Sequence, residues 1–199
     1  MLVDQFCSHA MDEDRIEARL GGGAVLTAEE SNYVREAAIS EDSDLRRWAL
    51  GLLRANAELC GITSRDSHWL ASIADCTEDL HVAADALSVL CNWLANGGQN
   101  RDRIVRALRC DPGSPGGVWM LITGSSLAGN LLAQGTCPEV ARALRQVLHS
   151  GLPTEIRESA RDAFLRANGM TARDIVLAER SGSLDLWGEA SRLADALAT

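Results

Sequence analysis

Cysteine and histidine are the residue types in this sequence that could bind a metal ion or act as a nucleophile. There are six cysteines and four histidines, but no two cysteines have the Cys-x-x-Cys spacing and no two histidines stand one helical turn apart. A zinc site needs three or four such ligands that converge. The sequence therefore predicts no metal, no cofactor and no catalytic residues.

Cys76 is the cysteine best placed for reactivity, because it precedes a candidate helix N-cap, Thr77, and a helix N-terminus lowers the pKa of a thiol. Cys60, Cys91 and Cys110 instead occupy apolar positions near helix ends. Cysteines spread singly over helices are typical of small buried hydrophobes in a reducing compartment. We therefore interpret the cysteines as structural, and we expect a cytoplasmic location.

The five tryptophans raise the question of nucleic-acid binding, because aromatic side chains can stack on bases. Trp48 and Trp93 stand at apolar helical positions, which predicts that both pack in the core. The one dense group of arginines, within residues 101–109, spreads over more than one face of a helix and makes no basic stripe. A nucleic-acid partner is therefore not expected.

Charge is unevenly distributed along the chain, which contains no lysine. Residues 1–100 carry 17 acidic residues and 7 arginines, a net charge of −10, whereas residues 101–199 carry 11 and 12, a net charge of +1. Such asymmetry can steer a basic partner toward one end of a molecule. The balance also argues against bulk binding of nucleic acid, for which phosphate neutralisation supplies most of the affinity.

Acidic residues gather at two successive turns between predicted helices. Equivalent turns of a repeat array lie on one edge, so these acids would form a ridge that faces a basic protein partner. Acidic residues are also favoured at helix N-termini by the helix dipole alone, and this alternative stays open. The predicted partner-binding residues of this ridge are Glu41, Asp42, Asp44, Glu78 and Asp79.

A second polar row follows one face of the helix predicted over residues 78–95, together with two arginines of the helix before it. We expect this row to line a concave surface, where polar groups would set the specificity of binding and buried aromatic groups would supply most of the energy. Its candidate partner-binding residues are Arg47, Arg54, His81, Asp85 and Asn92, with Ser88 between them.

The elements that would position these residues are helices, because Ala and Leu far outnumber β-branched and aromatic residues. Capping residues and glycine stops mark both ends of ten predicted helices. A further helix is expected within residues 4–20, before a linker, Gly21-Gly22-Gly23. The ten helices span residues 27–39, 44–59, 65–75, 78–95, 100–110, 118–134, 138–149, 154–168, 171–180 and 183–197.

The predicted helices pair into five hairpins whose first helices start about 36 residues apart, a period typical of repeat proteins. The second helices share a pattern, seen in Leu45-Arg46 before Ala49 and in Ile156-Arg157 before Ala160. These residues resemble the signature of HEAT-like (armadillo/HEAT-type) repeats over about residues 27–168. The second repeat departs from it at His81, and the third, within 118–135, lacks it.

The resemblance implies an all-α fold, an α-solenoid of about five antiparallel helix hairpins with an extra N-terminal helix. Residues 1–199 would form a single domain, with the helix and glycine linker at 1–23 and the repeats at 24–199. The longest apolar stretch, residues 116–133, is interrupted by glycines and polar residues, which predicts a buried helix rather than a membrane span.

Proteins of HEAT-like form mostly bind other proteins along a concave surface, and a few are enzymes or bind nucleic acid. We therefore predict a non-enzymatic binding module with a basic protein partner and no membrane association. A bacterial immunity or antitoxin-type protein, an adaptor and a secretion-related chaperone all fit this description. The alternatives are a HEAT-like enzyme, either DNA glycosylase-like or of lyase type, and an assembly protein that associates with itself.

Overall fold

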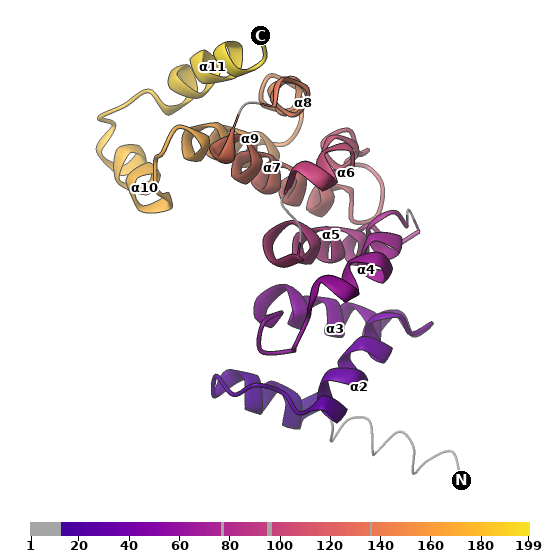
Figure 1. Ribbon diagram of the computed structural model, residues 1–199. Coiled ribbons are helices and arrows are strands. Elements are labelled where there is room, and N and C mark those ends of the chain that lie inside the picture. Colours follow the sequence, from indigo (N-terminus) through magenta and orange to yellow (C-terminus); the bar gives the residue numbers. More distant parts are fainter. Residues whose placement is uncertain (1–12, 77, 95–96, 136) are drawn as a thin grey trace.

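The computed structural model describes residues 13–76, 78–94, 97–135 and 137–199, and all regular structure within these ranges is helical. The predicted all-α class is therefore confirmed. Residues 13–21 are helical and precede the elements labelled in Figure 1. These are α2 (Ala28–Ala38), α3 (Ser43–Asn56), η1 (Ser64–Asp66), α4 (Ser67–Ala74), α5 (Leu80–Val89), η2 (Leu90–Leu94), η3 (Gly97–Asn100), α6 (Arg101–Ala107), α7 (Gly117–Gln134), α8 (Pro138–Leu148), α9 (Thr154–Ala167), α10 (Ala172–Ser181) and α11 (Leu186–Leu197).

Neighbouring helices pack against each other in pairs: α2 with α3, α4 with α5, α6 with α7, and α8 with α9. The second helices of these pairs also pack in succession, α3 against α5, α5 against α7 and α7 against α9. Figure 1 shows the resulting arrangement as an arc, with the N-terminal helices at one end and α10 and α11 at the other.

The last two helices do not pack on each other as the earlier pairs do. α11 packs mainly against α8 and α9, whereas α10 projects from the arc with few contacts (Figure 1). The reason is the size of the apolar faces. α11 buries Leu186, Ala190, Leu193 and Ala194, but α10 buries only Ile175 and Ala178.

Most helix starts follow the predicted capping chemistry. Thr27 and Glu30 form a reciprocal capping box at α2, and Asp42 accepts hydrogen bonds from two backbone N–H groups at the start of α3. Thr171 caps α10, and Pro138 occupies the first turn of α8.

Three predicted starts are wrong or moved. Thr63 caps the turn before α4, where the sequence predicts a helix from residue 65, and Asp185 caps α11, where it predicts a start at residue 183. Asp79 is the N-cap of α5, and Thr77 lies outside the described residues. At all three starts the side chain that caps is the one whose oxygen reaches a free backbone N–H of the first turn.

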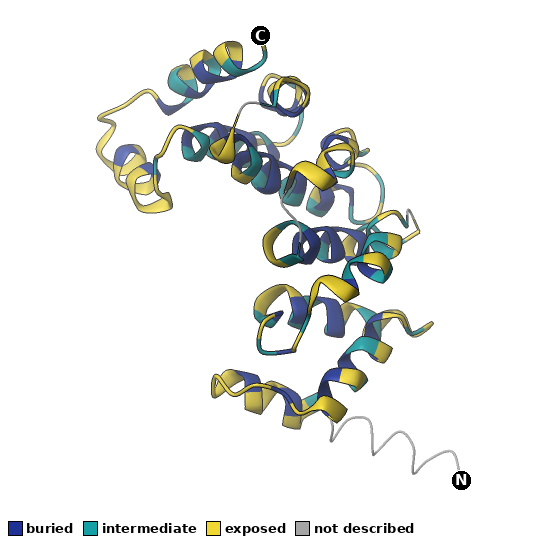
Figure 2. Cartoon of the chain, viewed as in Figure 1, coloured by how far each residue is buried: buried dark blue, intermediate teal, exposed yellow. Residues whose placement is uncertain are grey.

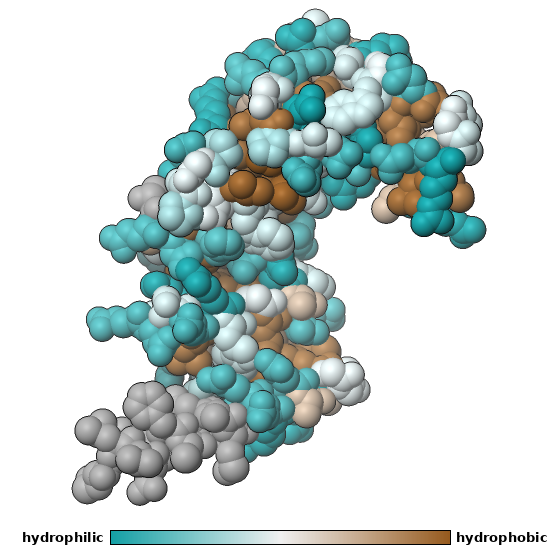
Figure 3. Space-filling model, turned by 180° about the vertical axis from the view of Figure 1, so that it is seen from behind, coloured by the Kyte–Doolittle hydropathy of each residue, from teal (hydrophilic) through white to brown (hydrophobic). Residues whose placement is uncertain are grey.

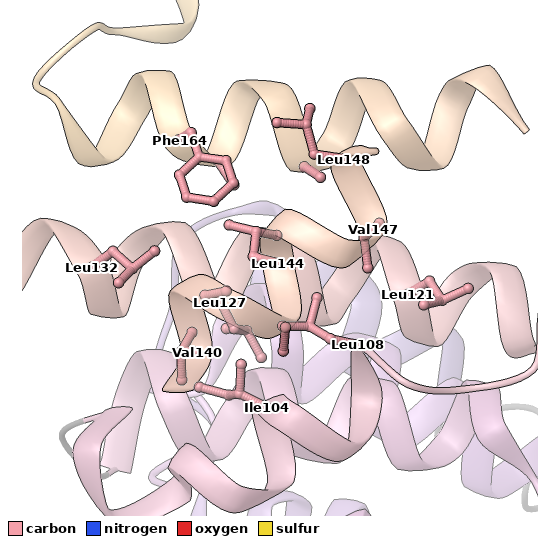
Figure 4. Close-up of a cluster of buried hydrophobic side chains, with 14 of the residues drawn as sticks. Ile104, Leu108, Leu121, Leu127, Leu132, Val140, Leu144, Val147, Leu148 and Phe164 are labelled. Atoms are coloured by element: carbon pink, nitrogen blue, oxygen red, sulfur yellow. The ribbon is translucent and has the colours of Figure 1, made fainter. Parts of the chain in front are cut away.

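Buried side chains form two hydrophobic clusters that meet at α5. Val82, Ala86 and Val89 belong to the N-terminal cluster, whereas Ala83 and Leu87 belong to the C-terminal one. α5 and α7 are accordingly buried over most of their length, as Figure 2 shows. Figure 4 shows the C-terminal cluster, in which side chains from four helices converge beside Phe164.

α7 is held close to its neighbours by glycines. A Cβ atom added at Gly129 would lie 2.9 Å from the Cα atom of Ala163 on α9, and one added at Gly124 would lie 2.9 Å from the Cβ atom of Ala107 on α6. The segment that lacks the repeat signature is therefore tightly packed, because its glycines let the neighbouring helices approach closely. Along the described part of the chain, no helix combines the length and hydropathy needed to cross a membrane.

Candidate protein-interaction site

The turns that carry the predicted acidic ridge and the hollow of the arc lie on different sides of the molecule. Figure 1 shows the α2–α3 and α4–α5 turns on the same edge, at the right of that view. The hollow of the arc lies on the other side and is visible at the right of Figure 3, where α10 overhangs it. The successive contacts of α3, α5, α7 and α9 make these helices a continuous layer between the two ends.

The acidic edge consists of the side chains at the α2–α3 and α4–α5 turns. Glu41, Asp42, Asp44 and Glu78 are exposed. Asp42 also caps α3, since its Oδ1 accepts hydrogen bonds from the N–H groups of Asp44 (2.9 Å) and Leu45 (3.1 Å). Asp42 thus caps a helix and is also exposed to solvent.

Asp79 does not belong to the exposed ridge, and its predicted role there needs correction. Its side chain is only 13% exposed and is bound on both oxygens. Oδ1 accepts hydrogen bonds from the N–H groups of His81 and Val82, and Oδ2 accepts one from Arg47 Nη2 at 3.0 Å. Asp79 is therefore a cap and an anchor between α3 and α5.

Arginines of the N-terminal half mostly neutralise acids that are buried or nearly buried. Arg35 Nε lies 2.9 Å from Asp66 Oδ1, and Arg19 Nη1 lies 3.5 Å from Glu30 Oε1. Burial raises the pKa of Asp66, but hydrogen bonds from Arg35 and Thr63 outweigh it and hold this pKa below its ordinary value. Because these arginines are paired with buried acids, they do not neutralise the exposed acids at the two turns.

The second predicted row comes together across three helices. Arg54 Nε on α3 lies 3.3 Å from Asp85 Oδ1 on α5, and the Arg54 guanidinium stands 5.1 Å from the centre of the Trp119 ring on α7. Asn92 Nδ2 donates to Ser88 Oγ at 3.3 Å, and Asn130 Nδ2 on α7 donates to Asn92 Oδ1 at 3.4 Å. The row is thus a set of contacts between helices, with Arg47, Arg54, His81 and Asn92 still exposed.

Asp85 is the one acid of this row with a raised pKa. Burial raises the pKa, and the nearby Arg54 and Trp119 only partly offset that effect. Arg54 lies at ion-pair distance from Oδ1, but no hydrogen bond reaches this buried oxygen. His81 lies alongside, against Gly116, whose φ of 79° and close approach to His81 leave no room for a Cβ atom.

Asp85→Asn and Asp79→Asn are expected to change stability in opposite directions. The pKa of Asp85 is higher in the folded than in the unfolded protein, so its protonated form stabilises the fold. This contribution is complete at a pH below the pKa of the unfolded state, and it is lost as the pH rises through the pKa of the folded state. The depressed pKa of Asp79 stabilises the fold above the unfolded pKa and ceases to do so as the pH falls. Urea unfolding from about pH 3 to about pH 7, which covers the titration of carboxylates, measures the free energy of unfolding of both variants.

At neutral pH we therefore expect Asp79→Asn to be less stable than the wild type and Asp85→Asn to be as stable or more stable. Both differences should shrink as the pH falls toward the ordinary aspartate pKa. Equal losses in the two variants at neutral pH would contradict the assignment of a raised pKa to Asp85.

The prediction that Trp48 and Trp93 pack in the core is wrong for Trp93, which is 46% exposed. Trp93 lies in η2, the π-helical segment that continues α5, and the wider turn of a π-helix shifts its side chains around the helix axis. Trp93 Nε1 donates to the carbonyl oxygen of Arg54 at 3.4 Å. Trp48 is half-buried against the N-terminal cluster, and its Nε1 donates to Glu17 Oε1 at 2.7 Å.

The cysteines among the described residues have the environment of structural side chains. Burial raises the pKa of Cys60 to about 11 and that of Cys91 to about 12, so neither is a thiolate at neutral pH. Cys76 and Cys110 are half-buried and line a cavity of about 120 Å³ beside Arg103. Cys7 lies outside the described residues, and within the described ranges no His, Cys, Asp and Glu side chains group as metal ligands do.

Sequence reasoning missed a cluster that attaches α10 to α9 and α11. Arg161 is 4% exposed, and its Nη1 donates to Glu179 Oε1 on α10 at 3.0 Å. The guanidinium groups of Arg157 and Arg161 both lie over the Trp187 ring of α11, at 5.5 Å and 5.2 Å from its centre. The signal available in the sequence was the pair of arginines one helical turn apart.

Comparison of the chain with protein-family models, with curated proteins and with solved structures found no match. The candidate site is therefore described by its own geometry alone. It comprises an exposed acidic edge at two turns and a polar row shared by α3, α5 and α7.

Proposed function

We propose that this chain is a non-enzymatic protein-binding module with a HEAT-like α-solenoid architecture. Residues 1–199 would form one domain, with 1–23 as an N-terminal helix and linker and 24–199 as the repeats. The successive packing of α3, α5, α7 and α9 supports this architecture, since stacked repeats bury a continuous core between neighbours. The partner would be a protein with a basic surface.

One observation carries the choice of a basic partner. Glu41, Asp44 and Glu78 are exposed at two turns on one edge and form no ion pair within the described residues, whereas nearby arginines are bound to Asp66, Asp79 and Asp85. A cationic surface that approached this edge would find charges that no internal group neutralises. Complementary charge of this kind raises association rates and selects partners.

The biological role follows from this chemistry as a proposal. An acidic module that covers a basic protein is what an immunity or antitoxin-type protein of bacteria would be, and an adaptor or secretion chaperone would use the same surface. We propose that it acts in the cytoplasm. The polar row around Arg54 and Asn92 would then supply specificity on the concave side.

The test is reversal of the three unpaired acids, Glu41→Arg, Asp44→Arg and Glu78→Arg together. The capping residues Asp42 and Asp79 are left intact, because their loss would unfold helix starts rather than test binding. The wild type should retain a partner of high isoelectric point from the native host, identified by mass spectrometry. The triple variant should bind that purified partner at least about tenfold more weakly in calorimetry.

A charge-matched control separates the edge from overall charge. Asp14, Glu29 and Glu155 are also exposed and unpaired within the described residues, and they lie away from the two turns. Reversal of these three to arginine changes the net charge equally and should leave the affinity within about twofold of wild type. Equal weakening in both triple variants, or in neither, would contradict the acidic edge.

A second candidate, an enzyme of HEAT-like form acting on nucleic acid or as a lyase, is favoured by the environment of Asp85. Its raised pKa, with Arg54 and Trp119 beside it, suits a general acid. The binding module is preferred because Arg47 and Arg54 are paired with acids and leave no basic groove there. Glycosylase and lyase assays that detect turnover by the wild type and none by Asp85→Asn would favour the enzyme instead.

A further inference from the structure

α10 and the loop that follows it carry three exposed apolar side chains. Val176 and Leu177 on α10 are 44% and 52% exposed, and Leu184 in the following loop is 42% exposed. The opposite face of α10, with Ile175 and Ala178, is already buried, so these side chains do not belong to the core. Neighbouring exposed apolar side chains of this kind can form part of an interaction surface.

Two arginines border this α10 patch. Arg173 lies one turn before Leu177, and Arg180 lies one turn after Val176, so both border the patch on the helix surface. Within the described ranges neither arginine forms an ion pair, and Glu179 on the same helix is bound to Arg161. Asp174, beside Arg173, is exposed but accepts hydrogen bonds from Thr171 at the N-cap of α10. The α10 patch is therefore apolar at its centre and basic at its rim.

A complementary patch lies at the other end of the same chain, at the α2–α3 corner. Ile39, the residue that ends α2, is 62% exposed. Near it in the chain are Glu36, Glu41 and Asp44, which are exposed and form no ion pair with any residue that the structure describes. This acidic corner is apolar at its centre and negative at its rim, the reverse of the α10 patch.

We propose that the α10 patch of one molecule docks on the acidic corner of a second copy of this chain. Val176 and Leu177 would cover Ile39, while Arg173 and Arg180 would meet the carboxylates around it. A symmetric contact between two α10 helices is disfavoured, because an antiparallel pair centred on Val176 and Leu177 sets Arg173 beside Arg180 of the second helix. A head-to-tail contact of this kind repeats without closing unless a ring forms.

The observations that support self-association do not rest on the proposed protein partner. Both interactions would nevertheless use Glu41 and Asp44. Assembly and partner binding therefore compete for the acidic corner. In a head-to-tail assembly, only the molecule at one end would have an acidic corner that could bind the partner.

Sedimentation and light scattering of the full chain test the proposal over about a hundredfold range of concentration at low and high salt. The mass of the wild type should rise steadily with concentration at low salt and fall toward the monomer at high salt. Leu177→Glu disables the α10 patch, and Ile39→Arg disables the acidic corner. Each variant alone should remain a monomer, because each lacks one half of the contact.

An equal mixture of Leu177→Glu and Ile39→Arg should restore one contact and stop at a dimer of one copy of each. Val25→Glu, at a side chain 62% exposed outside both patches, should associate like the wild type. A wild type that stays monomeric throughout overturns the proposal. So does an Ile39→Arg variant that still associates while Leu177→Glu does not, since that result would show a symmetric α10 contact.

Discussion

Gly129→Ala is expected to destabilise the protein, whereas Gly51→Ala is expected to stabilise it. Both glycines lie inside helices, α7 and α3, where alanine normally gains about 0.5–1 kcal/mol. At Gly51 no atom lies within 4 Å of the new Cβ, so the gain should appear in full. At Gly129 the Cβ would lie 2.9 Å from the backbone of Ala163.

A backbone atom cannot move aside as a flexible side chain can, so α7 and α9 would have to separate at this point. The strain from overfilling a packed contact costs about 1–3 kcal/mol, which outweighs the gain in helix propensity. Leucine at the same position should cost more. Urea unfolding of the two alanine variants measures the sign directly, and stabilisation by Gly129→Ala would show that α7 and α9 do not approach as described.

Phe164→Ala is expected to have the largest effect among the substitutions considered, a loss of about 3–5 kcal/mol in the free energy of unfolding. The ring is fully buried and sits in the C-terminal cluster between α9 and its neighbours, as Figure 4 shows. Its removal loses both the transfer free energy of the ring and the contacts of the atoms around the cavity. Such a loss is a large part of the free energy of unfolding of a typical domain, about 5–15 kcal/mol.

Phe164→Leu is the matched control, because it keeps an apolar side chain and most of the volume. We expect it to cost less than about 1.5 kcal/mol. Thermal and urea unfolding, followed by circular dichroism, would compare the two variants. A loss below about 1 kcal/mol for the alanine variant would contradict the burial of this ring in a packed core.

The helices could be predicted from the sequence because their signals are local. The capping box of Thr27 and Glu30, the cap at Asp42 and the proline at 138 each act within one turn of their own helix. The N-cap of α11, Asp185, could not be predicted in this way, and the predicted helix starts two residues earlier. Which oxygen captures the free N–H groups depends on where the preceding loop enters the helix.

The polar row shows the limit of reasoning from one helix at a time. The sequence placed Asp85 and Asn92 on one face of their helix and grouped them with Arg47 and Arg54. The structure brings Arg54 to Asp85, whereas Asn92 contacts Asn130 of α7. It did not show that Asp79 is occupied by Arg47, or that Trp119 lies beneath Arg54. Those contacts join residues more than 30 positions apart, and no local pattern encodes them.

The sequence by itself determined the all-α class, most helix boundaries and the acidity of the first half. Propensity, capping and composition act through neighbours in the chain, so they can be read without a structure. Tertiary packing alone decided which acids remain unpaired, that Trp93 is exposed by a π-helical turn, and that α11 rather than α10 covers α8 and α9. Those outcomes depend on which buried surface each helix meets, and that choice is made only when distant helices pack together.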